Sequence, residues 1–169
     1  FRGREYFPSH DVLLPAVAKQ VIHDILKGLV CWAHFGIPRG VFAGRGSRTI
    51  HFPEGSKEDE REVESNELVV FTVRCVKALC SVSARFSLIH PFPSYLWWFR
   101  YVSSLALRPK VVFATLDQCK YGLPCKNRVG LLTNIETFEG LACSCTGQCR
   151  STRMSEGAKE EQGGLYPRA

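Results

Sequence analysis

The sequence predicts an α/β fold with a Rossmann-like, doubly wound and mostly parallel sheet. Short apolar runs typical of buried strands alternate with longer stretches of helical periodicity, and glycines and prolines punctuate them. Helical stretches between the runs are the crossovers that parallel strands need. With 169 residues, 45% hydrophobic and 22% charged, the chain is long enough for one domain with its own core.

The first predicted helix covers residues 15–27. Its apolar side chains recur at helical spacing, and Gly28 provides a stop. Residues 29–35 form a nearly continuous apolar run, which predicts a buried strand. A loop over residues 36–55 follows, and its high content of glycine, proline and arginine favours a functional role.

The second helix is predicted over residues 65–84, after a charged and solvated segment at 56–64. Residues 86–89 form the next strand, and residues 94–107 a third helix that is rich in aromatic side chains.

Two more strands are predicted at residues 110–116 and 129–133, with a loop at 121–126 between them. Three loops follow predicted strands and contain a proline: Pro38, Pro91 and Pro124. Because parallel strands end at the same edge of a sheet, we expect these loops to share one edge, where doubly wound folds bind ligands.

Residues 1–150 are predicted to form this domain, and residues 151–169, which have few apolar side chains, a disordered tail. The chain begins at Phe1 and its single methionine is Met154, which predicts a fragment of a longer parent. The net charge of +6 favours phosphate-bearing partners, so DNA and RNA are both candidates. No segment reaches the roughly 18 apolar residues of a membrane span and no signal peptide is present, so we expect no membrane partner and an intracellular location, nuclear or cytoplasmic.

The eight cysteines are predicted to be mostly reduced, because a chain of this length does not need disulfides to form a core. Three of them lie in apolar runs and are expected to be buried thiols: Cys31, Cys75 and Cys80. Cys143, Cys145 and Cys149 lack the spacing of a zinc knuckle, so no metal site is predicted, with a small zinc cluster as the alternative.

Three segments carry a family resemblance. They are Gly-Ile-Pro-Arg-Gly-Val-Phe-Ala at 36–43, Ile-His-Pro at 89–91 with Ser94 and Trp97 after it, and Tyr-Gly-Leu-Pro-Cys-Lys at 121–126 leading to Leu-Leu-Thr-Asn at 131–134. In this order, they resemble the cytosine-5 DNA methyltransferase family, and more closely its divergent phage-like or mobile-element-like branch. The resemblance runs from about Asp11 to Cys149. It implies a partial S-adenosylmethionine-dependent methyltransferase fold that lacks the amino-terminal cofactor-binding segment, with S-adenosylmethionine as the cofactor of the family.

The catalytic residues implied by this resemblance are missing. Arg39 stands where the family has the cysteine whose thiolate adds to cytosine, and a guanidinium cannot attack carbon. Ile89 stands where the family has the glutamate that protonates the base, and His90, next to it, does not replace a carboxyl group. Cys31 is expected to lie too far along its strand to substitute. We therefore expect no intact catalytic site.

Five cations are candidates for nucleic-acid contact: Arg39, Arg45, Arg48, Lys126 and Arg128. Trp97, Trp98 and Phe99 are expected to pack in the core rather than stack on bases, and His90 to be a hydrogen-bonded structural residue. Three hypotheses stay open. The chain is a degenerate cytosine-5 methyltransferase-like domain without activity, a non-catalytic DNA- or RNA-binding module, or a decayed reading frame that folds poorly.

Overall fold

The computed structural model describes residues 11–42, 47–123 and 126–147. The elements follow in this order: α1 (Pro15–Leu26), β1 (Trp32–Gly36), α2 (Glu60–Ser81), β2 (Arg85–Pro91), η2 (Tyr95–Trp98), α3 (Arg100–Ala106), β3 (Val112–Asp117), η3 (Gln118–Tyr121), β4 (Arg128–Thr133) and η4 (Glu136–Leu141). The predicted tail at 151–169 lies outside the described residues.

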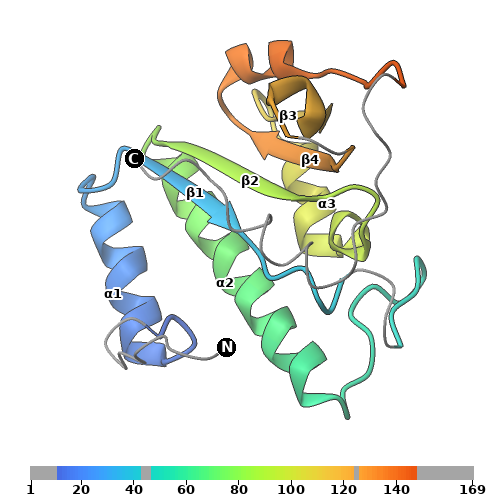
Figure 1. Ribbon diagram of the computed structural model, residues 1–169. Helices are drawn as coiled ribbons and strands as arrows, with labels where there is room; N and C mark the ends of the chain where they lie inside the picture. Colours follow the sequence, from blue (N-terminus) through green and yellow to red (C-terminus); the bar gives the residue numbers. More distant parts are fainter. Residues whose placement is uncertain (1–10, 43–46, 124–125, 148–169) are drawn as a thin grey trace.

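The four strands form one mixed sheet in the order β1-β2-β4-β3 (Figure 1). Strands β1 and β2 pair in parallel, whereas β4 pairs antiparallel with both β2 and β3. The predicted α/β class is confirmed, but the prediction of a mostly parallel sheet is wrong. The reason is the connection between β3 and β4, residues 118–127, which is shorter than the dozen or more residues that a parallel crossover needs. Its described residues form only a short 3-10 turn.

The described parts of the three loops nevertheless share one edge, as predicted, and Pro124 itself lies outside the described residues. Gly36 at the end of β1 pairs with Ile89, and Pro91 at the end of β2 pairs with Val129 at the start of β4. Asp117 at the end of β3 pairs with Arg128. The antiparallel pairing therefore returns the third loop to the edge at which β1, β2 and β3 all end, and we call it the carboxyl edge.

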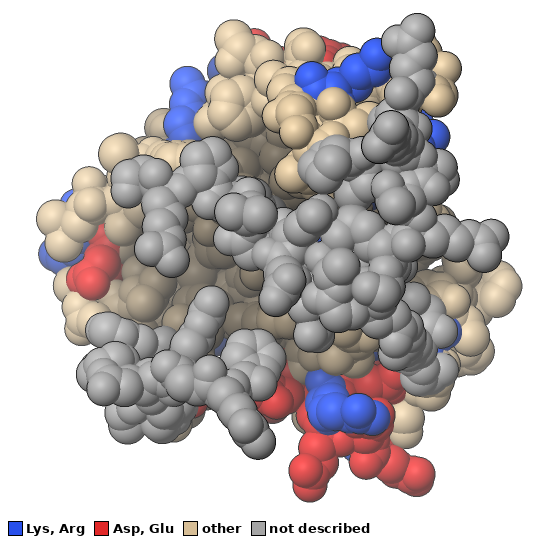
Figure 2. All heavy atoms as spheres, in the orientation of Figure 1, with Lys and Arg blue, Asp and Glu red and all other residues tan. Residues whose placement is uncertain are grey.

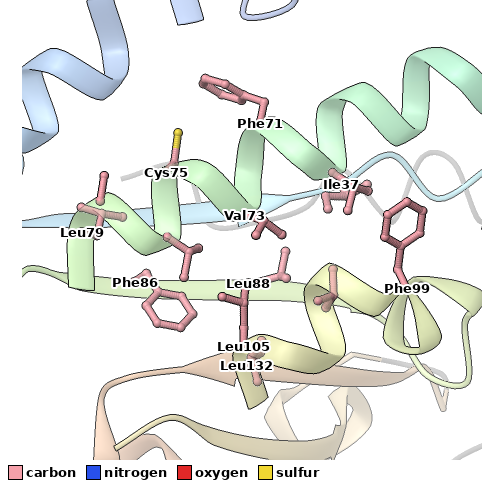
Figure 3. Packing of buried hydrophobic residues seen from close by; sticks show 14 of the residues in the cluster. Ile37, Phe71, Val73, Cys75, Leu79, Phe86, Leu88, Phe99, Leu105 and Leu132 are labelled. Carbon is pink, nitrogen blue, oxygen red and sulfur yellow. The ribbon is translucent and has the colours of Figure 1, made fainter. Parts of the chain in front are cut away.

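Helix α2 lies between α1 and the sheet. Figure 3 shows Val73 directed toward Leu88 of β2, with Phe71 and Cys75 on the opposite side of the helix. The side chain of Asp59 caps the helix by accepting a hydrogen bond from the Arg61 backbone N–H, at 3.0 Å. The helix consequently begins five residues before the predicted start, inside the segment that was expected to be solvated, and buries Glu62.

The predicted helix at residues 94–107 is divided into η2 and α3. Phe99 breaks it, because its backbone is extended (φ −59°, ψ 121°) and its side chain is buried in the core. The Ser94 hydroxyl accepts a hydrogen bond from the Leu96 backbone N–H, which starts the first turn. Trp97 packs in the core as predicted, whereas Trp98 is 41% exposed.

Strand β1 is an edge strand within the described part of the chain, so the prediction of a buried strand is wrong. Its side chains alternate between exposed and half-buried, because helices cover only one of its faces. Cys31, just before it, is exposed rather than buried. Cys75 is buried as predicted, and burial raises the pKa of its thiol to about 11, while Cys80 is half-buried.

The opposite face of β3 and β4 carries a second, smaller core. Leu116, Val129 and Leu131 pack there with Phe138 and Leu141 of η4. Among the described residues, no helix is long and apolar enough to cross a membrane.

Candidate functional site

The first two loops of the carboxyl edge are fastened to each other through backbone carbonyls. The Ile37 carbonyl lies 3.2 Å from Nδ1 of His90. The Phe42 carbonyl accepts hydrogen bonds from the Tyr95 backbone N–H and from the Ser94 hydroxyl, both at 3.2 Å. The turn that carries Arg39 is therefore held in place by the residues that follow β2.

The second and third loops are joined in the same way. The Phe92 backbone N–H donates to the Arg128 carbonyl at 2.9 Å, and the Trp97 indole N–H donates to the Pro91 carbonyl at 2.9 Å. Gly130 permits this packing, because a Cβ at its position would lie 2.7 Å from the Trp97 ring. Thus residues that the sequence places 90 positions apart form one continuous edge.

His90 is enclosed at the centre of this edge. Its side chain is 2% exposed, and the rings of Phe42 and Trp97 contact its imidazole edge-on. Burial, together with a smaller effect of the Arg39 charge, lowers the pKa of His90 to about 4, although the hydrogen bond to Ile37 acts in the opposite direction. Among the described residues its Nε2 atom has no hydrogen-bond partner. The imidazole is therefore neutral near pH 7 and holds the first loop, which is the structural role expected for it.

Ile89 lies on the other face of the sheet from His90, because consecutive strand residues alternate. It packs against Leu116, Val129 and Leu131 in the second core. The position that resembles the family's glutamate therefore contributes an aliphatic side chain to a core.

Arg39 is half-buried in the turn between Ile37 and Phe42. Its carbonyl accepts the backbone N–H of Phe42 at 3.2 Å, and its charge reaches His90. A guanidinium here can attract an anion, but it can neither add to a base nor accept a proton from one.

Arg48 does not fit the prediction of phosphate contact, because its side chain is fully buried. Its Nη1 donates to the Pro53 carbonyl and its Nη2 to the Glu62 carbonyl at 3.1 Å, while Nε lies 3.7 Å from the Glu62 carboxylate. The guanidinium also lies over the Phe42 ring, 4.2 Å from its centroid. All of these groups are internal, so Arg48 is a structural residue in this conformation.

Glu62 is the charged partner of Arg48. The sequence did not predict this role, because Glu62 lies in a run of charged residues that was expected to be solvated. Its carboxylate accepts hydrogen bonds from the Ser47 backbone N–H and hydroxyl, at 3.2 and 2.7 Å, and from the Ser56 backbone N–H at 2.5 Å. Burial raises its pKa, but these hydrogen bonds and the charge of Arg48 outweigh that effect and hold the pKa below its ordinary value. Gly55 makes room for the carboxylate, since a Cβ there would lie 2.1 Å from it.

Asp117 forms ion pairs with Arg128 and Lys126, the two cations of the third loop that were predicted to contact nucleic acid. Its fully buried carboxylate accepts two hydrogen bonds from the Arg128 guanidinium, at 2.9 and 3.0 Å, and one from the Cys145 backbone N–H at 2.6 Å. Lys126 lies 3.9 Å away, with 49% of its side chain exposed. The hydrogen bonds from Arg128 hold the pKa of Asp117 at about 2. Arg128 is therefore largely committed to an internal pair, whereas Lys126 still reaches solvent.

Cys143 and Cys145 lie beside Asp117, where the Cys143 carbonyl accepts the Asp117 backbone N–H at 3.0 Å. Within the described ranges, no three His, Cys, Asp or Glu side chains are grouped to hold a metal ion. Cys149, the third member of the alternative zinc cluster, lies outside these ranges, as does Arg45. No family model matches the chain, and no curated protein or solved structure matches it significantly.

Proposed function

We propose that the chain is a degenerate cytosine-5 DNA methyltransferase-like domain that transfers no methyl group and retains affinity for nucleic acid. One observation carries this proposal: the three segments that resemble the family come together at one edge, and the positions that would need a thiolate and a carboxyl group hold Arg39 and Ile89. We infer the methyltransferase-like origin from the resemblance. We infer the loss of activity from the chemistry of these two side chains, which can supply neither the nucleophile nor the acid.

The strand arrangement agrees with a ligand-binding role for this edge. Strands β1, β2 and β3 run in one direction and end at the carboxyl edge, and the reversed β4 is inserted between β2 and β3. In doubly wound folds, ligands bind outside the carboxyl ends of the parallel strands.

S-adenosylmethionine itself does not fit the described residues. No carboxylate follows β1 or β2 within residues 37–42 or 92–99, and a carboxylate near a strand end is the group that binds ribose hydroxyls in doubly wound nucleotide folds. The rings of Phe42, His90 and Trp97 pack against one another at these two strand ends and occupy the space there. We therefore derive no step through this cofactor.

The test of lost activity is transfer from labelled S-adenosylmethionine to DNA. The unmodified protein should transfer nothing, and neither should Arg39→Cys, because the glutamate position remains Ile89. A fluorinated cytosine oligonucleotide, which traps the covalent intermediate of the family, should give no adduct. Robust transfer or an adduct with the unmodified protein contradicts the proposal.

Retained nucleic-acid binding is supported by the net charge of +6 and by Arg39 and Lys126 on the carboxyl edge. Binding isotherms on a DNA oligonucleotide at several salt concentrations test it. The slope of log K against log salt should decrease in magnitude by about 1 for Arg39→Ala, as one phosphate contact is lost. Arg48→Lys should leave the slope unchanged, because Arg48 is buried. Absence of binding at low salt contradicts this part of the proposal.

The third hypothesis, a decayed chain that folds poorly, makes a separate prediction. Native-state hydrogen exchange would then show no protected amides. Protection of the α2 amides between Val69 and Leu79, which are buried on both sides of the helix, would exclude it.

A further inference from the structure

Tyr121 is an exposed aromatic residue whose ring is nevertheless fixed. It ends η3 at the carboxyl edge, directly after β3, and 54% of its surface is exposed. Its hydroxyl donates a hydrogen bond to the Leu141 carbonyl at 2.7 Å. An exposed tyrosine normally rotates freely, whereas here the tip of the ring is tied down and the exposed part faces solvent. Such a ring loses little conformational freedom when a flat ligand stacks on it.

The turn beneath Tyr121 is closed by hydrogen bonds across its base. The Gln118 backbone N–H donates to the Asn127 carbonyl at 2.9 Å, and the Asn127 side-chain amide donates to the Gln118 side chain at 2.5 Å. Gly122, with φ of +97°, ends the 3-10 turn in a left-handed conformation. Together with the bond to Leu141, these contacts fix the ring relative to the sheet.

The chain on both sides of this ring is basic. Lys120 is exposed on the same turn, and Lys126 is half exposed across the loop. Asp117 is the one acidic residue between positions 112 and 135, and it is buried and paired with Arg128. The next acids along the chain, Glu136 and Glu139, are exposed on η4, whose last residue, Leu141, accepts the hydrogen bond from Tyr121.

Charges of both signs are visible on the surface. Figure 2 shows Lys and Arg atoms at the top of this face with a few Asp and Glu atoms behind them, and a larger group of Asp and Glu atoms, with Lys or Arg atoms among them, at the opposite end, where α2 begins.

We propose that Tyr121, flanked by Lys120 and Lys126, is a stacking contact for single-stranded nucleic acid. The proposal rests on the nucleic-acid binding proposed above and names the surface and the chemistry that perform it. Stacking on an aromatic ring requires an unpaired base, and nearby lysines bind the phosphates on either side of it. Three strand spacings of roughly 4.8 Å separate β1 from β3, so the ends of these two strands lie on the order of 14 Å apart along the edge. A single-stranded oligonucleotide laid across the ends of β1, β2 and β3 therefore passes the turns that carry Arg39 and Tyr121.

The test uses a fluorescein-labelled oligothymidine, its oligouridine counterpart and a blunt duplex. Tyr121→Leu should weaken binding of the single strands about tenfold, with little change in the salt slope, because a stacked base but no phosphate contact is lost. Lys120→Ala should reduce the magnitude of the slope by about 0.7. Tyr121→Phe, which keeps the ring but not its bond to Leu141, should weaken binding by a smaller factor than Tyr121→Leu. Comparison of the two single strands distinguishes DNA from RNA as the source of the bases.

Matched controls lie on other surfaces. Tyr101 is 40% exposed on α3 and has the Arg100 guanidinium over its ring, so it resembles Tyr121 in exposure and in charge, and Tyr101→Leu should bind like the unmodified protein. Lys77→Ala, on the exposed side of α2, should leave the slope unchanged. Thermal melts of each variant establish that the fold is intact.

The outcomes separate the two proposals. If the unmodified protein binds and Arg39→Ala reduces the slope, but Tyr121→Leu binds as tightly as the unmodified protein, the stacking contact is wrong and the edge still binds nucleic acid. Equal losses for Tyr121→Leu and Tyr101→Leu, or tighter binding to the duplex than to either single strand, also overturn it. If no oligonucleotide binds at low salt, both proposals fail.

Discussion

Arg48 with Glu62 and Arg128 with Asp117 are the same chemical pair in two settings. The Arg48 and Glu62 side chains are 0% and 1% exposed, whereas Arg128 is 35% exposed above a buried Asp117. The first pair secures the loop between β1 and α2 from inside, and the second secures the third loop while leaving Lys126 in solvent. Burial, rather than residue type, thus decides which arginine can contact a ligand. A fully buried pair is also costly to form and more costly to break.

The largest effect should come from breaking the buried pair. Glu62→Gln leaves the Arg48 charge without a counter-charge in the interior, and we expect it to lower the free energy of unfolding by about 3 kcal/mol or more. Urea denaturation measures this. Glu58→Gln, in the same charged run but exposed, is the matched control and should have little effect. The double variant Arg48→Met with Glu62→Gln should lose less than the sum of the two single losses, and an additive result would show that the two side chains are not coupled.

The next effect concerns His90 and pH. Because its pKa in the folded protein is about 4, the unfolded chain takes up a proton first as the pH falls below about 6.5. The contribution of His90 to stability should therefore fall by roughly 3 kcal/mol between pH 6.5 and 4 and change no further below that range. His90→Phe should remove this part of the dependence and leave the part due to His34, whose pKa burial also lowers. His51→Phe, at an exposed position, should retain both parts. An unchanged pH profile for His90→Phe would mean that another group titrates.

A smaller loss is expected at Gly55. Alanine there must adopt φ of +71° and also displaces the Glu62 carboxylate, so Gly55→Ala should cost about 2 kcal/mol. Gly28→Ala separates the two causes, because Gly28 has φ of +75° but nothing within 4 Å of the added Cβ. It should cost about 1 kcal/mol, from backbone strain alone. Equal losses in the two variants would show that the carboxylate moves freely.

The half-exposed pair should lose less on substitution than the fully buried pair. Asp117→Asn should lower the midpoint of thermal unfolding at pH 7 by less than Glu62→Gln does, because solvent screens Arg128. The pKa of Asp117 lies near 2 when folded, below the ordinary value near 4, so its contribution is present above about pH 4 and is lost as the pH falls toward 2. Asp117→Asn should flatten the stability profile in this acid range, and a larger loss than that of Glu62→Gln would reverse the comparison.

The sequence was sufficient for α1, for most of α2, for the positions of the four strands and for the shared edge. Apolar periodicity located α1 and most of α2, and the order of prolines after strands placed the loops of Pro38 and Pro91 together. The sequence did not predict that β4 runs antiparallel to its neighbours, because a short apolar run has the same pattern whichever way the strand runs in the sheet. It also gave no sign that Phe99 interrupts a helix, since an aromatic residue in the core and one in a helical repeat have the same pattern.

Residue identity by itself determined the chemistry: a guanidinium at position 39 and an aliphatic side chain at position 89 cannot perform nucleophilic or acid catalysis in any fold. Only the tertiary structure decided which charges are available. Arg48, Glu62 and Asp117 look like ordinary surface residues in the sequence, and they are buried because long-range contacts surround them with backbone donors and acceptors. Tyr121 was likewise read as part of a motif, and its role as a fixed, exposed ring depends on Leu141, which lies 20 residues further along the chain. Desolvation depends on what surrounds a group in space, and local sequence does not contain that information.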